Sequence, residues 1–295
     1  MLKLVLPTGS LEKPTLQMFE DAQLAVSCYN SRCYEGEIDD PRISRVRFMR
    51  PQEIPLYVAE GLFDLGITGL DWIMERGCQE RVQVVTQLPY SKATSHPVRI
   101  VVAVHESSGI DRVEDIPKGS RVTTEYVTLA KQYFAEKGID VQVEFSFGTT
   151  EAKVPEIADV AVELTERGTT LKANGLKIID VISESKTTLI ANPNSEQDPQ
   201  KHRAISEIKT LLLGALMARG RVLLKMNVAK VNLKKVLSLL PSMKAPTISQ
   251  LYSDADDYVA VETVVDRQGI NVLLPKLVSA GAEDILEIPI SKIIS

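Results

Sequence analysis

Residues 159–171 read DVAVELTERGTTL, and they predict a buried strand, a glycine-containing loop and the start of a helix. The run at 159–164 is mostly apolar, as expected of a strand that is covered on both faces. It carries Glu163 to the carboxyl end of the strand. Gly168 then stands among hydroxyl side chains, and a short helix follows and ends at Asn174-Gly175.

A loop of this kind can bind a phosphate group. The first turn of a helix has N–H groups without helical partners and a partial positive charge, which together favour an anion. Glycine lets the backbone approach the anion closely, and threonine hydroxyls add donors. The adjacent carboxylate could hold ribose hydroxyls, directly or through a metal ion. The alternative is a plain connecting turn, since any strand–loop–helix unit can carry a glycine.

Strands and helices alternate on both sides of this stretch. Strands are predicted at 2–6, 45–49, 64–69, 98–104, 120–124, 141–145, 177–183 and 187–191. Helices are predicted at 12–24, 51–60 and 129–137. The alternation is typical of α/β units around a largely parallel sheet.

The last third of the chain has a different pattern. NPNSEQDPQK at 192–201 contains two prolines and no aliphatic residue, and it predicts a linker. A long helix is expected at about 204–221. The elements predicted after it are strand 222–227, helix 233–239, strands 247–251 and 258–265, helix 270–280 and strand 284–289. This βαββαβ order is that of a ferredoxin-like domain.

Two more glycine-containing segments could bind an anion or simply turn the chain. LPTGSL at 6–11 follows the first strand, and its hydroxyl side chains could instead cap the next helix. DLGITGLD at 64–71 has two glycines between acidic residues, and a capped helix is again the alternative. Arginines near predicted strand ends would suit a heavily phosphorylated substrate, although each alone is typical of a solvated surface. These are Arg32, Arg50 and Arg121.

Composition excludes several classes of protein. The 34 basic and 39 acidic residues give a net charge of −5, so we expect no nucleic-acid partner. Three cysteines and three histidines show no zinc-ligand spacing, which predicts reduced thiols and no metal held by the protein alone. The first apolar run is too short for a signal peptide, and no stretch approaches the roughly 20 apolar residues of a membrane span. A cytoplasmic protein without a membrane partner is expected.

The common catalytic and nucleotide-binding motifs are absent from the sequence. It has no G-x-S-x-G, no G-x-x-x-x-G-K-[ST] and no G-x-G-x-x-G. The sequence therefore does not resemble a serine hydrolase, a P-loop ATPase or a Rossmann dehydrogenase.

Six segments, in order, resemble the long form of ATP phosphoribosyltransferase, the first enzyme of histidine biosynthesis. They are Leu4–Leu11 (LVLPTGSL), Arg50–Pro55 (RPQEIP), Asp64–Asp71 (DLGITGLD), Arg121–Thr124 (RVTT), Ala158–Leu176 (ADVAVELTERGTTLKANGL) and Leu239–Leu251 (LLPSMKAPTISQL). They extend over nearly the whole chain. The ADVAVEL…GTTLKANGL block and the PS-x-x-x-PTI element are the specific ones.

The resemblance implies an α/β fold with a two-lobed catalytic part, of the periplasmic-binding-protein type II, and a C-terminal ferredoxin-like βαββαβ regulatory domain. The first lobe is expected at 1–92, with 177–200 returning to it. The second lobe, with the phosphate loop, is expected at 93–176, and the regulatory domain at 201–295. The family forms dimers and hexamers, so a homo-oligomer is expected.

The implied reaction joins ATP and 5-phosphoribosyl 1-diphosphate (PRPP) to give N1-(5-phosphoribosyl)-ATP and diphosphate. Mg²⁺ accompanies the diphosphate, and free histidine is expected to inhibit by binding to the regulatory domain. Departure of diphosphate builds oxocarbenium character on the ribose, so the enzyme mainly positions N1 and stabilises the leaving charge. A dedicated protein nucleophile is not needed, and the sequence shows none.

The resemblance also implies site residues, in three groups. The cleft for diphosphate and ATP would be lined by Gly9, Ser10, Arg32 and Arg50, expected to be catalytic, and by Asp64 and Thr68. The 5-phosphate and ribose of PRPP would be bound by Glu163, Thr165, Glu166, Arg167, Gly168, Thr169 and Thr170. Histidine would be bound by Asn227, Met243, Ala245, Thr247 and Ala282.

The chain departs from the family pattern at three places. Many relatives have a lysine at the position of Thr8, where this chain lacks that cationic contact. The family loop usually begins Asp-Leu and has small residues before its glycine, where this chain has Glu163 and Glu166-Arg167. Asn227 stands where relatives often have an acid or a histidine, so inhibition by histidine is expected to persist but to be weaker.

Two other functions share the expected fold, a two-lobed solute receptor without catalysis and a catalytically silent subunit of a two-protein transferase. The missing export signal and the C-terminal domain expected at 201–295 argue against a solute receptor. The same domain argues against a catalytically silent subunit.

Overall fold

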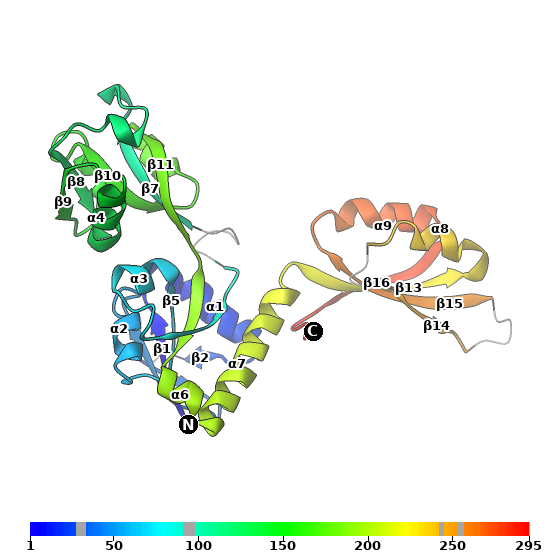
Figure 1. The fold of residues 1–295 in the computed structure, drawn as a ribbon. Helices are drawn as coiled ribbons and strands as arrows, with labels where there is room; N and C mark the ends of the chain where they lie inside the picture. Colours follow the sequence, from blue (N-terminus) through cyan, green and yellow to red (C-terminus); the bar gives the residue numbers. More distant parts are fainter. Residues whose placement is uncertain (28–33, 91–97, 242–244, 253–256, 295) are drawn as a thin grey trace. The chain divides into compact units, whose positions relative to one another are not determined.

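The computed structural model describes residues 1–27, 34–90, 98–241, 245–252 and 257–294. Contacts between residues divide the chain into two compact units. The first comprises Met1–Glu20 and Leu24–Lys209, and the second comprises Asp21–Gln23 and Thr210–Ser295. Within its described residues, the first unit contains two sheets and the second contains one (Figure 1).

The first sheet of the first unit has the strand order β2-β3-β4-β1-β5-β12-β6. Its strands are β1 (Leu2–Pro7), β2 (Val26–Ser27), β3 (Glu35–Ile38), β4 (Ile43–Met49), β5 (Leu65–Gly69), β6 (Gln83–Gln87) and β12 (Thr187–Ala191). The helices that accompany them are α1 (Glu12–Asp21), α2 (Ile54–Ala59) and α3 (Leu70–Glu75). β1 is parallel to β4 and to β5, so the carboxyl ends of these strands lie at one edge.

The second sheet has the order β11-β7-β10-β8-β9. Its strands are β7 (Val98–His105), β8 (Ser120–Thr124), β9 (Val141–Phe145), β10 (Val160–Thr165) and β11 (Leu176–Ser185). Helices α4 (Val127–Glu136) and α5 (Thr169–Ala173) and the 3-10 helix η4 (Thr150–Lys153) accompany them. β8, β9 and β10 are parallel, and β7 is antiparallel to β10 and β11.

The centre of β7 is buried on both faces of this sheet. Val102 packs in a core that includes Phe134 of α4. Val101, which points to the opposite face, packs in a core that includes Leu171 of α5. Because side chains alternate along a strand, two covered faces require a continuous apolar sequence, and VRIVVAV supplies it.

β11 differs from the expected division of the chain. The sequence analysis assigns 177–200 to the first lobe, but β11 pairs with β7 along its whole length. The chain returns to the first sheet only at β12, after Lys186.

Helices α6 (Pro193–Gln197) and α7 (Pro199–Ala218) occupy the segment that was predicted to be a linker, so that prediction is wrong. The Asn192 side chain accepts a hydrogen bond from the backbone N–H two residues later, and Asp198 accepts two from the first turn of α7. Each proline therefore lies in the first turn of a helix, where a missing N–H removes no helical bond. Two polar residues of this segment, Asn192 and Asp198, are thus helix caps.

The second unit has the order β14-β15-β13-β16, which is that of a ferredoxin-like fold. Its elements are β13 (Arg221–Ala229), α8 (Leu233–Leu237), β14 (Thr247–Gln250), β15 (Tyr258–Asp266), α9 (Ile270–Ser279) and β16 (Ala282–Pro289). Alternate residues of β13 are buried in a core with residues of α8 and α9. Helices α8 and α9 lie on the same face of the sheet (Figure 1).

The expected fold class is confirmed by this architecture. Among the described residues, the helices are all too short or too polar to cross a lipid bilayer.

Candidate active site

Gly9 and Ser10 follow β1, and Arg50 follows β4, at the shared carboxyl edge of the first sheet. The backbone N–H of Thr8 donates to the carbonyl of Met49 (2.8 Å), which holds the two strand ends together. Gly9 has a φ of +76°, a left-handed conformation that favours glycine. Ser10 and Arg50 are exposed. The structure thus brings a hydroxyl and a guanidinium to one sheet edge beside a glycine turn.

Thr68 lies in β5 near the same edge, but its side chain is fully buried. Its hydroxyl donates to the carbonyl of Pro51 (2.8 Å). This bond fixes the turn that precedes α2, so Thr68 supports the edge rather than facing a ligand. Arg32, which was also expected at this site, lies outside the described residues.

Asp64 precedes β5 and lies at the amino end of that strand, away from the edge with Gly9. Its carboxylate accepts hydrogen bonds from the Lys3 backbone (2.7 Å), the Ser195 hydroxyl (2.6 Å) and the Lys201 ammonium (2.7 Å). Burial disfavours the charged carboxylate, but the bonds from Lys201 and Ser195 outweigh it and hold the pKa of Asp64 below its ordinary value. The structure therefore does not place Asp64 with the other expected cleft residues.

Glu163 lies near the carboxyl end of β10 and is half-buried. Its Oε1 accepts a hydrogen bond from the backbone N–H of Leu164 (3.0 Å). Burial raises the pKa of Glu163 to about 6, and a hydrogen bond from Thr150 partly offsets this effect. The nearby carboxylates of Glu151 and Glu125 raise the pKa further. The pKa of Glu163 therefore lies well above that of an exposed glutamate.

The loop after β10 is folded back on itself. The backbone N–H of Gly168 donates to Oγ1 of Thr165 (2.8 Å). Gly168 has a φ of +73°, and a Cβ added there would lie 3.3 Å from Cδ1 of Ile178. Thr169 and Thr170 begin α5 and are exposed. The loop thus presents two threonine side chains to solvent at the start of a short helix.

Arg99 is a cationic residue beside this loop that the sequence analysis missed. It lies directly opposite Thr165 in the antiparallel register of β7 and β10. Directly opposite residues share a face of the sheet, and so do residues two positions apart in a strand. Arg99 therefore lies on the same face as Thr165 and Glu163. Only the strand register reveals that Arg99 is near the loop. Within the loop, Arg167 is exposed and Glu166 is half-buried.

Asp71 is a buried carboxylate that joins three segments of the first unit. It accepts hydrogen bonds from the hydroxyls of Tyr126 (2.8 Å) and Ser185 (2.5 Å). The ring of Trp72 stacks on that of Tyr126, with centroids 4.5 Å apart. Burial raises the pKa of Asp71 above its ordinary value. Because Asp71 follows β5 and Tyr126 follows β8, the contact links the carboxyl ends of two strands from different sheets.

No metal centre is formed by protein side chains in the described part of the chain. There, no three His, Cys, Asp or Glu residues come together as a metal-binding group. The oxygen donors at the second sheet edge are the Glu163 carboxylate and the threonine hydroxyls of the loop. Such donors suit Mg²⁺ that is held largely by a phosphorylated ligand.

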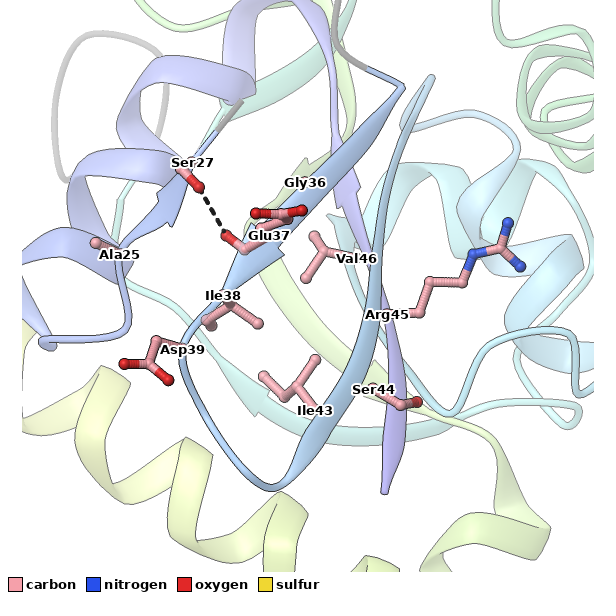
Figure 2. Close-up of a pocket in the computed structure, with 10 residues that line it drawn as sticks. All are labelled: Ala25, Ser27, Gly36, Glu37, Ile38, Asp39, Ile43, Ser44, Arg45 and Val46. Carbon is pink, nitrogen blue, oxygen red and sulfur yellow. Dashed lines mark hydrogen bonds between the residues drawn. The ribbon is translucent and has the colours of Figure 1, made fainter. Parts of the chain in front are cut away.

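Two pockets of the first unit lie apart from these residues. One, of about 480 Å³, is lined by residues of β2, β3, β4 and the segments beside them, and its Ser27 hydroxyl donates to the carbonyl of Glu37 (3.4 Å; Figure 2). The other, of about 420 Å³, is lined by residues that include His105, Lys118 and Asp159. These lie at the end of the second sheet opposite Glu163. Neither pocket is lined by an expected site residue.

The expected histidine-binding residues are partly brought together. Asn227 of β13 donates from Nδ2 to Oδ2 of Asp284 in β16 (2.9 Å), and Ala282 is buried in the same strand. Thr247 lies on β14, across β15 from β13. Ala245 precedes β14 and is exposed, and Met243 lies outside the described residues. The sequence analysis missed Asp284, whose place beside Asn227 depends on strand pairing.

Comparisons with known proteins agree along the whole chain. Residues 50–214 match the family model described as ATP phosphoribosyltransferase, and residues 218–292 match the one described as HisG, C-terminal domain. The ATP phosphoribosyltransferase of Pelotomaculum thermopropionicum is 44% identical over 293 residues, 99% of each chain. That of Prosthecochloris aestuarii is 46% identical over 294 residues, 100% of this chain and 98% of the relative.

Solved structures give a similar picture for part of the chain. The ATP phosphoribosyl transferase (HisG:HisZ) complex from Thermotoga maritima aligns with a TM-score of 0.60 and 26% identity, over 72% of this chain and 96% of that one. XAC2383 from Xanthomonas citri bound to ATP aligns with a TM-score of 0.50 and 12% identity, over 71% of this chain and 83% of that one. The second likeness is one of fold alone.

Proposed function

Because the chain belongs to the ATP phosphoribosyltransferase family, we propose that it transfers the phosphoribosyl group of PRPP to N1 of ATP and releases diphosphate. In the family this is the first step of histidine biosynthesis. The observation that supports it best is the half-buried Glu163 beside the Gly168 loop, at the carboxyl end of β10. A carboxylate next to an anion-binding loop suits a sugar phosphate, because it can accept hydrogen bonds from ribose hydroxyls.

The residues present suit a reaction that depends on position and charge. Nitrogen N1 of ATP forms a bond to C1 of the ribose as the bond from C1 to the diphosphate oxygen breaks, and its electron pair leaves with diphosphate. The loop at 165–170 holds the 5-phosphate, and the Glu163 carboxylate holds the ribose and stabilises positive charge near C1. Ser10 and Arg50, at the edge of the first sheet, bind the diphosphate or ATP.

We propose Mg²⁺ as the cofactor, carried by the diphosphate of PRPP. Bound there, Mg²⁺ neutralises negative charge on the leaving group. The Glu163 carboxylate would be a hard oxygen donor for it through the ribose, in keeping with the oxygen ligands that Mg²⁺ prefers. A chelator should abolish activity, and added Mg²⁺ should restore it.

For the second unit we propose regulation by free histidine, in a cytoplasmic homo-oligomer. The amide of Asn227 lacks the charge that an acid would provide at this position. The Asp284 carboxylate, bonded to that amide, places a negative charge within reach of an ammonium or imidazole group. Histidine must also favour one arrangement of the protein over another if its binding is to inhibit at a distance.

The test is release of diphosphate by the purified full chain with ATP, PRPP and Mg²⁺. Activity that needs both substrates, and yields a phosphoribosylated ATP by mass spectrometry, supports the proposal. Saturable binding of both ligands without product would instead identify a binding protein.

A further inference from the structure

The segment 146–153 packs against the same face of the second sheet as the phosphate loop. Val154, just after η4, shares a hydrophobic core with Leu171 of α5 and Ala161 of β10. Glu163 is two residues beyond Ala161 and therefore points to the same face. The Thr150 side chain of η4 lies beside the Glu163 carboxylate and lowers its pKa. Glu163 is thus bordered by the phosphate loop and by the segment that ends in η4.

Lys153 is the cation of this segment, and its ammonium is held in place. Nζ of Lys153 donates to Oγ of Ser146 (2.6 Å), and the Thr150 hydroxyl donates to the same oxygen (3.0 Å). Ser146 and Thr150 are buried, and Lys153 is half-buried. The Ser146 hydroxyl in turn donates to the carbonyl of Gly148 (3.1 Å). These hydrogen bonds fix the ammonium on Ser146, next to Thr150, whose side chain lies beside Glu163.

The ammonium lacks a counter-charge in the described part of the chain. No carboxylate there comes within ion-pairing distance of Nζ, and its one hydrogen-bond partner is a neutral hydroxyl. An ammonium has three N–H donors, so two remain for a ligand. A half-buried charge is costly unless an opposite charge accompanies it. An anionic group on a substrate would supply that charge.

Further negative charge lies around Glu163, next to the phosphate loop. The carboxylates of Glu151 and Glu125 raise the pKa of Glu163, and negative charge of this kind disfavours an anion. We propose that the Lys153 ammonium binds a phosphoryl group of PRPP at the 165–170 loop and offsets these carboxylates. This inference rests on the proposed function. It adds a substrate-binding residue that comes from a different segment of the chain.

Steady-state kinetics of the full chain test the proposal. Lys153→Met keeps the length of the side chain and removes its charge, so KM for PRPP should rise about 10- to 100-fold while KM for ATP changes little. Lys153→Arg should recover a large part of the loss. The matched control is Lys118→Met. Lys118 is an exposed lysine in the turn before β8. It pairs with Asp140 at the end of the sheet opposite Glu163, and its loss should leave both KM values unchanged.

A purely structural role for Lys153 predicts a different result. Ser146→Ala removes the partner of the ammonium but keeps its charge, so it should raise KM for PRPP much less than Lys153→Met. Equal effects of these two variants, or an unchanged KM for PRPP in Lys153→Met, would overturn the proposal. Thermal unfolding of each variant separates a loss of binding from a loss of fold.

Two probes identify the group that is bound. Ribose 5-phosphate and inorganic diphosphate each represent one anionic end of PRPP. Binding of ribose 5-phosphate should weaken in Lys153→Met, whereas a loss confined to diphosphate would contradict a position at the 165–170 loop. Calorimetry with these probes does not require turnover. If the wild-type chain releases no diphosphate, the proposed function fails, while a loss of probe binding in Lys153→Met still supports a phosphoryl-binding lysine.

Discussion

Replacing Glu163 with glutamine should stabilise the protein at pH 8 and impair catalysis at the same time. Folding raises the pKa of this carboxyl from 4.5 to about 6, chiefly through burial. A raised acid pKa means that the folded state favours the protonated form. The associated stability is present below pH 4.5 and is lost as the pH rises through about 6. At pH 8, where the carboxylate is charged and buried, the raised pKa lowers the free energy of unfolding by about 2 kcal/mol.

Glu163→Gln removes the charge but keeps an oxygen that can accept the bond from Leu164. Urea unfolding of the full chain between pH 5 and pH 8 measures the effect. The free energy of unfolding of the variant should exceed that of the wild type by up to about 2 kcal/mol at pH 8, and the two should converge toward pH 5. The exposed Glu156→Gln serves as the control, with a change of about 0.5 kcal/mol or less. A variant that is less stable at pH 8, or a difference that does not vary with pH, would refute this reasoning.

Gly168→Val should raise KM for PRPP and lower the free energy of unfolding by about 1–3 kcal/mol, since valine is strained at a φ of +73° and its Cβ approaches Ile178. Unchanged PRPP saturation in a folded variant would remove the loop from the site. Tyr126→Phe deletes a hydrogen bond to the buried Asp71 and should cost about 1–3 kcal/mol by urea unfolding, whereas no loss would mean that Ser185 alone satisfies the carboxyl. Asp284→Asn tolerates the φ of +49° at this position and should weaken histidine binding measured by calorimetry; unaltered binding would place the effector elsewhere.

Sequence patterns predict the elements whose burial is uniform. The strand at 98–104 is apolar throughout because both faces are covered, and a continuous run of this kind stands out in a sequence. β6 was not predicted, since Gln83–Gln87 is a largely exposed strand without a regular apolar side. The sequence predicts a linker where the structure has the five-residue helix α6, because one and a half turns are too short to display a helical period.

The residues of the candidate site also differ in how well the sequence predicts their positions. Gly9 and Arg50 could be placed together, because each follows a strand and parallel strands end at the same edge. Asp64 could not, because it stands before its strand, at the amino end. Arg99 and Tyr126 were missed because their neighbours, Thr165 and Asp71, come from distant segments that only strand order and register bring near.

The position of β12 between β5 and β6 has a consequence for how the chain folds as it is synthesised. β12 contains residues Thr187–Ala191, so β6 has no partner for its place in the first sheet until the ribosome has passed the whole of β7 to β11. The second sheet consists entirely of residues 98–185 and can form as soon as β11 emerges. Folding during translation therefore proceeds from the inserted part to the part that encloses it. Until then the segment from β1 to β6 remains an incomplete sheet. The backbone N–H and C=O groups on the edge of β5 that β12 will pair with stay open to chaperones and to other nascent chains.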